Sequence, residues 1–187
     1  MNLKTKPMRF KMLLFVFVFA SFSAKAQEKK ITTFHRMLIL NEKDEMLVVK
    51  IKDKKVWVTP GLYQNTKQSI KQGIDSIAST YGMKVFDIEL KAIYGVKNPS
   101  KKYYSTRNIF VMKTKSIHSK LPVILDKAEW ISIEESEKFI NIPYVNWFIQ
   151  DVFKNPNVTR FGTVEKQLIE GKLTPKIVEE FYNFKKE

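Results

Sequence analysis

Residues 61–83 read GLYQNTKQSIKQGIDSIASTYGM, and this stretch decides the predicted fold. Apolar side chains recur in it at helical spacing, at Ile70, Ile74, Ile77, Ala78 and Tyr81. That period places them on one face of a helix. Asn65 is suited to cap the start, and Gly82 to follow the end, where a left-handed residue is wanted. The stretch therefore predicts an amphipathic helix between Asn65 and Gly82.

The segments on either side of this helix are rich in strand-forming residues. The predicted strands are residues 31–40, 46–51, 57–59, 85–95, 104–114 and 129–133. A helical turn at 134–139 and a helix that begins at Pro143 follow them. Together these elements predict one α/β domain over residues 27–155. Gly171 and Pro175 suit the end of one helix and the start of another, so residues 156–187 predict a short helical C-terminal extension.

The first 26 residues have the pattern of an export signal. Four basic residues lie between Lys4 and Lys11, and an apolar run follows from Met12 to Ala20. Ala24 and Ala26 are small residues in the spacing that a signal peptidase accepts. The apolar run is shorter than the ~20 residues that a membrane span needs. The sequence therefore predicts cleavage after Ala26 and a periplasmic or secreted protein.

Composition excludes several classes of site. The chain has 187 residues, no cysteine and two histidines, which excludes disulfides, cysteine-ligated metals and a multi-histidine metal site. Residues 1–26 hold five of the 33 basic residues and none of the 19 acidic ones, so the chain from Gln27 onward carries a net charge of +9. The lysines are scattered, which is typical of a solvated basic surface. Nucleic-acid binding is not expected.

The order of these elements, with Trp57-x-x-Pro-Gly before the central helix, resembles a Nudix domain. The signature of that family is Gly-x5-Glu-x7-Arg-Glu-U-x-Glu-Glu-x-Gly-U, where U is aliphatic. Anchored without a gap, it matches Gly61, Ile77, Gly82 and Met83. The resemblance covers residues 31–154. It implies a Nudix-like α/β/α sandwich with a mixed sheet.

The other positions of the signature differ from the family. Where the family has Glu, Arg, Glu, Glu and Glu, this chain has Lys67, Asp75, Ser76, Ser79 and Thr80. In the family, the carboxylates on the helix are similar to a set of Mg²⁺ ligands, and the metal activates the attacking water. Neutral hydroxyls do not hold a divalent ion in this way. No metal and no cofactor are therefore expected, except Mg²⁺ if other carboxylates rebuild the site.

Lys67 and Asp75 have the opposite charges to the family's residues at the same two positions. They are either a charge-reversed pair that holds the loop to the helix, or two unrelated surface charges. The sequence leaves both interpretations open.

Several polar and aromatic side chains are candidates for ligand contacts. Trp57 is suited to stack against a flat ligand, although such residues more often belong to a core. Tyr63, Gln64 and Asn65 follow the opening glycine of the signature and offer hydrogen-bonding groups for a polar ligand.

Three hypotheses for the function remain. The first is a non-catalytic Nudix-fold protein that binds a small molecule or a protein in the former active-site cleft. The second is a metal-dependent hydrolase of nucleoside diphosphate-linked substrates, with relocated carboxylates such as Glu129, Glu134 and Glu135. The third is a basic structural protein that contacts an anionic envelope surface. The sequence gives no oligomeric state.

Overall fold

The computed structural model describes residues 30–183, so the predicted export signal at 1–26 lies outside the described residues. The strands are β1 (Lys30–Leu40), β2 (Met46–Ile51), β3 (Trp57–Val58), β4 (Gly61–Tyr63), β5 (Phe86–Asn98), β6 (Tyr103–Lys113), β7 (Leu125–Ile131), β8 (Arg160–Ile169) and β9 (Lys172–Tyr182). The helices are α2 (Ile70–Thr80), the 3-10 turn η2 (Pro99–Lys101), α3 (Ser136–Phe139) and α4 (Pro143–Lys154). The short strand β4 and the turn η2 were not predicted; apart from these and the tail, the elements agree with the predicted ones to within a few residues.

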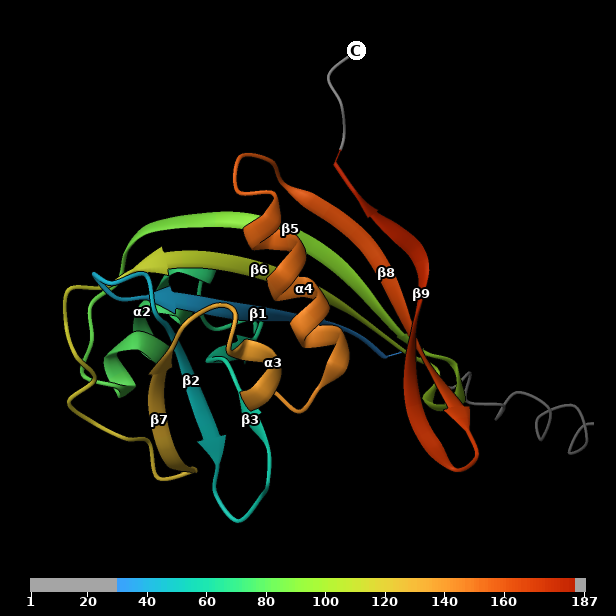
Figure 1. Cartoon of the computed structure of the whole chain (residues 1–187), viewed down its shortest axis with the longest axis horizontal. Coiled ribbons are helices and arrows are strands. Elements are labelled where there is room, and N and C mark those ends of the chain that lie inside the picture. The colour runs from blue at the N-terminus through green and yellow to red at the C-terminus, as the bar shows by residue number, and fades with distance from the viewer. Residues whose placement is uncertain (1–29, 184–187) are drawn as a thin grey trace, which may run out of the picture.

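The strands join into one mixed sheet in the order β3-β2-β1-β6-β5-β8-β9, with β4 paired to β1 and β7 paired to β2 (Figure 1). The pairs β1–β6 and β5–β8 are parallel, and the other pairs are antiparallel. Helices α2 and α4 lie on opposite faces of the sheet. The predicted α/β/α sandwich with a mixed sheet is confirmed.

Each face of the sheet has its own hydrophobic core. On one face, Ile74 and Ala78 of α2 pack with Met37 and Ile39 of β1. On the other face, the core lies under α4, and its buried members include Leu38, Val48, Tyr94, Ile109, Val145, Phe148, Ile149 and Val152. Since neighbouring residues of a strand point to opposite faces, the continuous apolar end of β1 is buried on both sides. This explains why that strand lacks an apolar/polar alternation.

The two glycines that frame the signature have structural reasons to be glycine. A Cβ on Gly61 would lie 2.6 Å from the carbonyl oxygen of His35, so only glycine lets β4 approach β1 so closely. Gly82 has a φ of +72°, in the left-handed region that follows a helix end. The segment between these two glycines corrects the predicted N-cap of the helix. The N-cap of α2 is Ser69, which forms a capping box with Gln72, whereas Asn65 lies in the preceding turn.

The predicted helical C-terminal extension is wrong: the tail is a β-hairpin that extends the sheet. Strand β8 lies parallel to β5, and β9 pairs with β8 at the edge. The turn between them is Glu170-Gly171, and both residues have positive φ, 48° and 77°. A two-residue turn of this kind matches the twist of a hairpin, so Gly171 is a turn residue and ends no helix. Pro175 lies in the edge strand, where a missing N–H is tolerated.

A buried ion pair joins this hairpin to the rest of the domain. Arg160 at the start of β8 donates to both carboxylate oxygens of Asp151 in α4, each at 2.9 Å. The same guanidinium donates to the carbonyl oxygen of Phe181 in β9 at 2.8 Å. Burial and the bonded Asp151 carboxylate raise the pKa of Tyr94 in β5, whose hydroxyl also donates to Asp151. Among residues 30–183, no helix is long and apolar enough to cross a membrane.

Candidate functional site

The helix of the signature presents hydroxyl groups where carboxylates are needed for metal binding. Ser76, Ser79 and Thr80 are exposed on α2. The hydroxyl of Thr80 donates to the carbonyl oxygen of Ile77 at 2.7 Å. This face therefore offers weak neutral ligands, one of which already bonds within the helix.

The charge-reversed pair between Lys67 and Asp75 does not form. Asp75 instead pairs with Lys71, one helical turn before it and exposed like it. The backbone N–H of Lys67 donates to the side-chain oxygen of Asn65 at 2.8 Å. Of the two open interpretations, the one that agrees with the structure is that Lys67 and Asp75 are unrelated surface charges. The hydrogen bond from Lys67 also gives Asn65 a role within the turn.

The carboxylates that the hydrolase hypothesis requires, Glu129, Glu134 and Glu135, lie on β7 and in the turn after it. Glu129 is opposite Val48 of β2. Glu135 accepts hydrogen bonds from the backbone and hydroxyl of Ser132, both at 3.3 Å. Over residues 30–183, no group of three or more His, Cys, Asp or Glu side chains is arranged to hold a metal ion.

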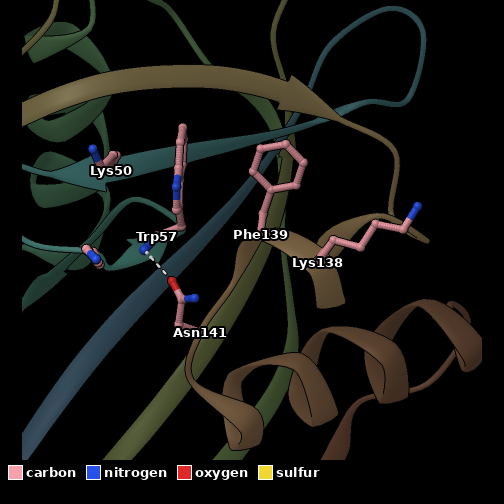
Figure 2. A pocket seen from close by; sticks show the side chains of 6 residues that line it. Lys50, Trp57, Lys138, Phe139 and Asn141 are labelled. Atoms are coloured by element: carbon pink, nitrogen blue, oxygen red, sulfur yellow. Dashed lines mark hydrogen bonds between the residues drawn. The ribbon is translucent and has the colours of Figure 1, made fainter.

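Trp57 lines a cavity of about 360 Å³. The other lining residues are Lys50, Lys55, Lys138, Phe139 and Asn141, so β2, β3 and α3 all contribute. The Trp57 and Phe139 rings are 5.4 Å apart between centroids and meet edge to face at 88°. Figure 2 shows the two rings side by side, with Lys50 beside Trp57 and Lys138 beside Phe139.

The polar groups of this cavity are mostly positive. Lys50 has a long ion pair with Asp126, at 3.6 Å, while Lys55 and Lys138 are exposed. The side-chain oxygen of Asn141 accepts from the backbone N–H of Trp57 at 3.2 Å, which fixes the start of β3 against the segment before α4 (Figure 2). Two aromatic rings and three lysines suit a ligand that carries both a flat ring and negative charge.

Tyr63 and Gln64 line a second cavity, of about 480 Å³. Its other lining residues are Ile31, Thr32, Thr33 and Tyr103. Gln64 is largely committed to the protein: its oxygen bonds His35 Nε2 at 2.8 Å, and its amide donates to the carbonyl oxygens of Asn65 and Gln68. Tyr63 is more than half exposed. The structure thus divides the four predicted ligand contacts between two cavities and a turn.

Sequence reasoning missed two arginines beside the second cavity. Arg36 of β1 and Arg107 of β6 are both buried, on the face of the sheet that α4 covers. The signal was present as an arginine in the interior of each of two predicted strands, 31–40 and 104–114. Arg107 donates to the hydroxyl of Tyr103 at 3.4 Å and lies over the rings of Phe34 and Tyr63.

No family model and no curated protein matches the sequence. Among solved structures, the chain is similar to a mutator MutT protein from Bacillus halodurans, with a TM-score of 0.59 and 18% identity over 79% of this chain and 97% of that one. A NUDIX hydrolase from Nitrosomonas europaea gives 0.56 and 19%, over 68% and 90%. An ADP-ribose pyrophosphatase from Streptococcus suis gives 0.51 and 16%, over 71% and 96%. At such identities the likeness is one of fold.

Proposed function

We propose that this protein is an exported binding protein that does not hydrolyse its ligand. The chain has the Nudix fold, but its signature helix carries hydroxyls in place of carboxylates. The ligand binds in the cavity between Trp57 and Phe139, and it combines a flat ring with negative charge. The observation that carries this proposal is the aromatic pair surrounded by Lys50, Lys55 and Lys138.

The chemistry of the signature helix supports a role without hydrolysis. Mg²⁺ binds through hard anionic oxygens, and it keeps its hydration shell unless carboxylates or phosphates replace it. Ser76, Ser79 and Thr80 supply no negative charge, and Asp75 pairs with Lys71. Metal-activated water, the usual nucleophile of such a site, therefore has no support from this helix.

Calorimetric titration with Mn²⁺ tests the missing metal site. We expect no binding to the protein at millimolar Mn²⁺. The matched positive control is the triple variant S76E/S79E/T80E, which places three carboxylates on one exposed helix face and should gain metal affinity. Micromolar binding to the unaltered protein would contradict the proposal. The variants E129Q, E134Q and E135Q would then identify the carboxylates of a working hydrolase.

ADP-ribose is a suitable probe for the cavity, because it carries a flat base and a diphosphate and a structural neighbour is named for it. We expect it to change the tryptophan fluorescence and to remain intact with Mg²⁺ present. Lys138→Gln should weaken this binding about fivefold, through loss of one charged contact. Lys154→Gln, at the exposed end of α4, is the control and should bind normally. Mg²⁺-dependent cleavage of the diphosphate, or equal losses in both variants, would contradict the proposal.

A second candidate function is contact with an anionic envelope surface. The loop between β6 and β7 exposes Ile117, Val123 and Ile124, with Val123 85% exposed. The exposed Lys115 and Lys120 lie in the same loop. Apolar side chains that enter an interface, next to lysines that attract anionic headgroups, are the two requirements for reversible membrane contact.

A further inference from the structure

Arg36 and Arg107 lie next to each other on the sheet. In the parallel pairing of β1 with β6, Arg107 is opposite Phe34, and Arg36 is two residues farther along β1. Tyr63 and Gly61 of β4 are opposite Phe34 and Arg36 on the other side of β1. Residues two apart on a strand share a face, so both guanidinium groups emerge on the α4 face. Both lie within 5.5 Å of the centre of the Phe34 ring.

Both guanidinium groups are buried with few partners. Arg36 is 6% exposed and Arg107 is 8% exposed. Arg36 donates from Nη1 to the hydroxyl of Thr59 at 2.7 Å, and the Nε atoms of both arginines have no hydrogen-bond partner within the described residues. Between residues 30 and 183, no carboxylate forms an ion pair with either one. Buried charges without a paired anion are costly, and stacking on a ring offsets only part of the cost.

The local electrostatics are those of an unneutralised positive site. The pKa of Arg36 is lowered to about 10, mainly by burial; the charge of Arg107 contributes to the lowering, and the Tyr144 and Tyr63 hydroxyls oppose it. Burial raises the pKa of Tyr103, but hydrogen bonds from Ser105 and Thr32 and the charge of Arg107 outweigh burial, so the net shift is downward. The groups that face the arginines are thus hydroxyls, which can also donate to an anion.

We infer that Arg36 and Arg107 form a binding site for a tetrahedral oxyanion, such as a phosphate or sulfate group. The second cavity gives the approach, because Tyr63 and Tyr103 line it and both touch Arg107. Two guanidinium forks match the oxygens of such a group, and they are more easily desolvated than lysine. The anion is either free or the end group of a larger molecule. The site goes beyond the proposed function, since it involves neither Trp57 nor the lysines of the first cavity.

The test is thermal unfolding of the protein with inorganic phosphate, inorganic sulfate or phenyl phosphate, against sodium chloride at the same ionic strength. We expect stabilisation by phosphate, sulfate or phenyl phosphate that chloride does not reproduce. Equal stabilisation by inorganic phosphate and phenyl phosphate indicates a free oxyanion, and stronger stabilisation by phenyl phosphate indicates an ester. No shift with any of the three anions, or the same shift with chloride, overturns the inference.

Variants at Arg107 separate anion binding from a structural role. Arg107→Gln should weaken phosphate binding at least about tenfold, since a charged hydrogen bond is lost. Without anion, this variant should melt at the same temperature or higher, because repulsion of Arg36 is relieved. Arg107→Lys is the second variant: it keeps the charge, and loss of the planar fork should still weaken binding. Lys113→Gln, exposed on the same strand, is the matched control.

The results that overturn the inference are a phosphate response that survives in Arg107→Gln, or one that Lys113→Gln also removes. Neither depends on whether ADP-ribose binds at Trp57, so failure of this site and failure of the proposed function are separate outcomes.

Discussion

At the scale of single residues, the side chain of Asp151 connects three elements of the fold through hydrogen bonds. It receives two hydrogen bonds from Arg160 and one from Tyr94, so one carboxylate connects α4, β8 and β5. Both side chains of the ion pair are about nine-tenths buried. Removing one partner of such a pair leaves the other charge in a medium that solvates it poorly.

We predict that Asp151→Asn lowers the free energy of unfolding by about 3 kcal/mol, because Arg160 then keeps a buried charge without a counter-ion. Urea unfolding measures this. Asp75→Asn, which removes the exposed pair with Lys71, should change the same quantity by only about 0.5 kcal/mol. Similar losses in the two variants would contradict the importance of burial.

Residues of the site that are neighbours along the chain could be predicted from the sequence, whereas residues that only the fold brings together could not. The exposed hydroxyls of α2 follow from their positions along one helix, because helical spacing determines the face. Arg36 and Arg107 are 71 positions apart, and only the pairing of β1 with β6 brings them together. A sequence pattern describes neighbours along a chain. It does not give the register between two strands, which depends on the whole sheet.

At the scale of elements, α2 and the C-terminal hairpin show when local signals suffice. Helix α2 was predicted from its apolar stripe, and the only error was a cap four residues too early. In the tail, Gly171 and Pro175 are compatible with both a helix boundary and a turn or an edge strand. The pairing of β8 with β5 decides between them, and this is a tertiary contact.

We predict opposite effects of two substitutions in the Glu170-Gly171 turn. Glu170→Asn should stabilise the protein by about 0.5 kcal/mol, since asparagine tolerates the positive φ that this turn requires. Gly171→Ala should destabilise it by about 1 kcal/mol, because a Cβ is strained at that φ. No atom lies within 4 Å of the added Cβ, so the second effect is conformational and not a clash. Thermal unfolding measures both. A helical tail would reverse the Gly171→Ala result, since alanine favours helices.

At the scale of the whole molecule, the chain has a Nudix-like fold, but its charges differ from those of the signature that it resembles. The backbone requires glycine at Gly61 and Gly82. Helix α2 has no glutamate, and positive charge gathers instead around the first cavity and at Arg36 and Arg107. The chain from Gln27 onward has a net charge of +9, which attracts anions of any size to its surface. Such a positive potential suits a protein that binds an anionic ligand, and it equally suits a protein that associates with an anionic membrane.

Vesicle binding distinguishes these two uses of the positive charge. We predict that the protein sediments with phosphatidylglycerol vesicles at low ionic strength and not with phosphatidylcholine vesicles, since lysines in the β6–β7 loop require an anionic surface. Salt should release it, because screening shortens the range of the attraction. The double variant V123D/I124D should weaken sedimentation at least about tenfold, as it replaces exposed apolar side chains with charges that anionic lipid repels.

Leu168→Asp is the matched control, because Leu168 is also an exposed apolar residue but lies near the tip of the β8–β9 hairpin. It should leave vesicle binding unchanged if the β6–β7 loop is the contact. Equal losses in the control and in V123D/I124D would mean that net charge alone drives the association. Since the two aspartates lie outside both cavities, ADP-ribose and phosphate should bind V123D/I124D as they bind the unaltered protein. A loss of either would show that the substitutions disturb the fold instead of a membrane contact.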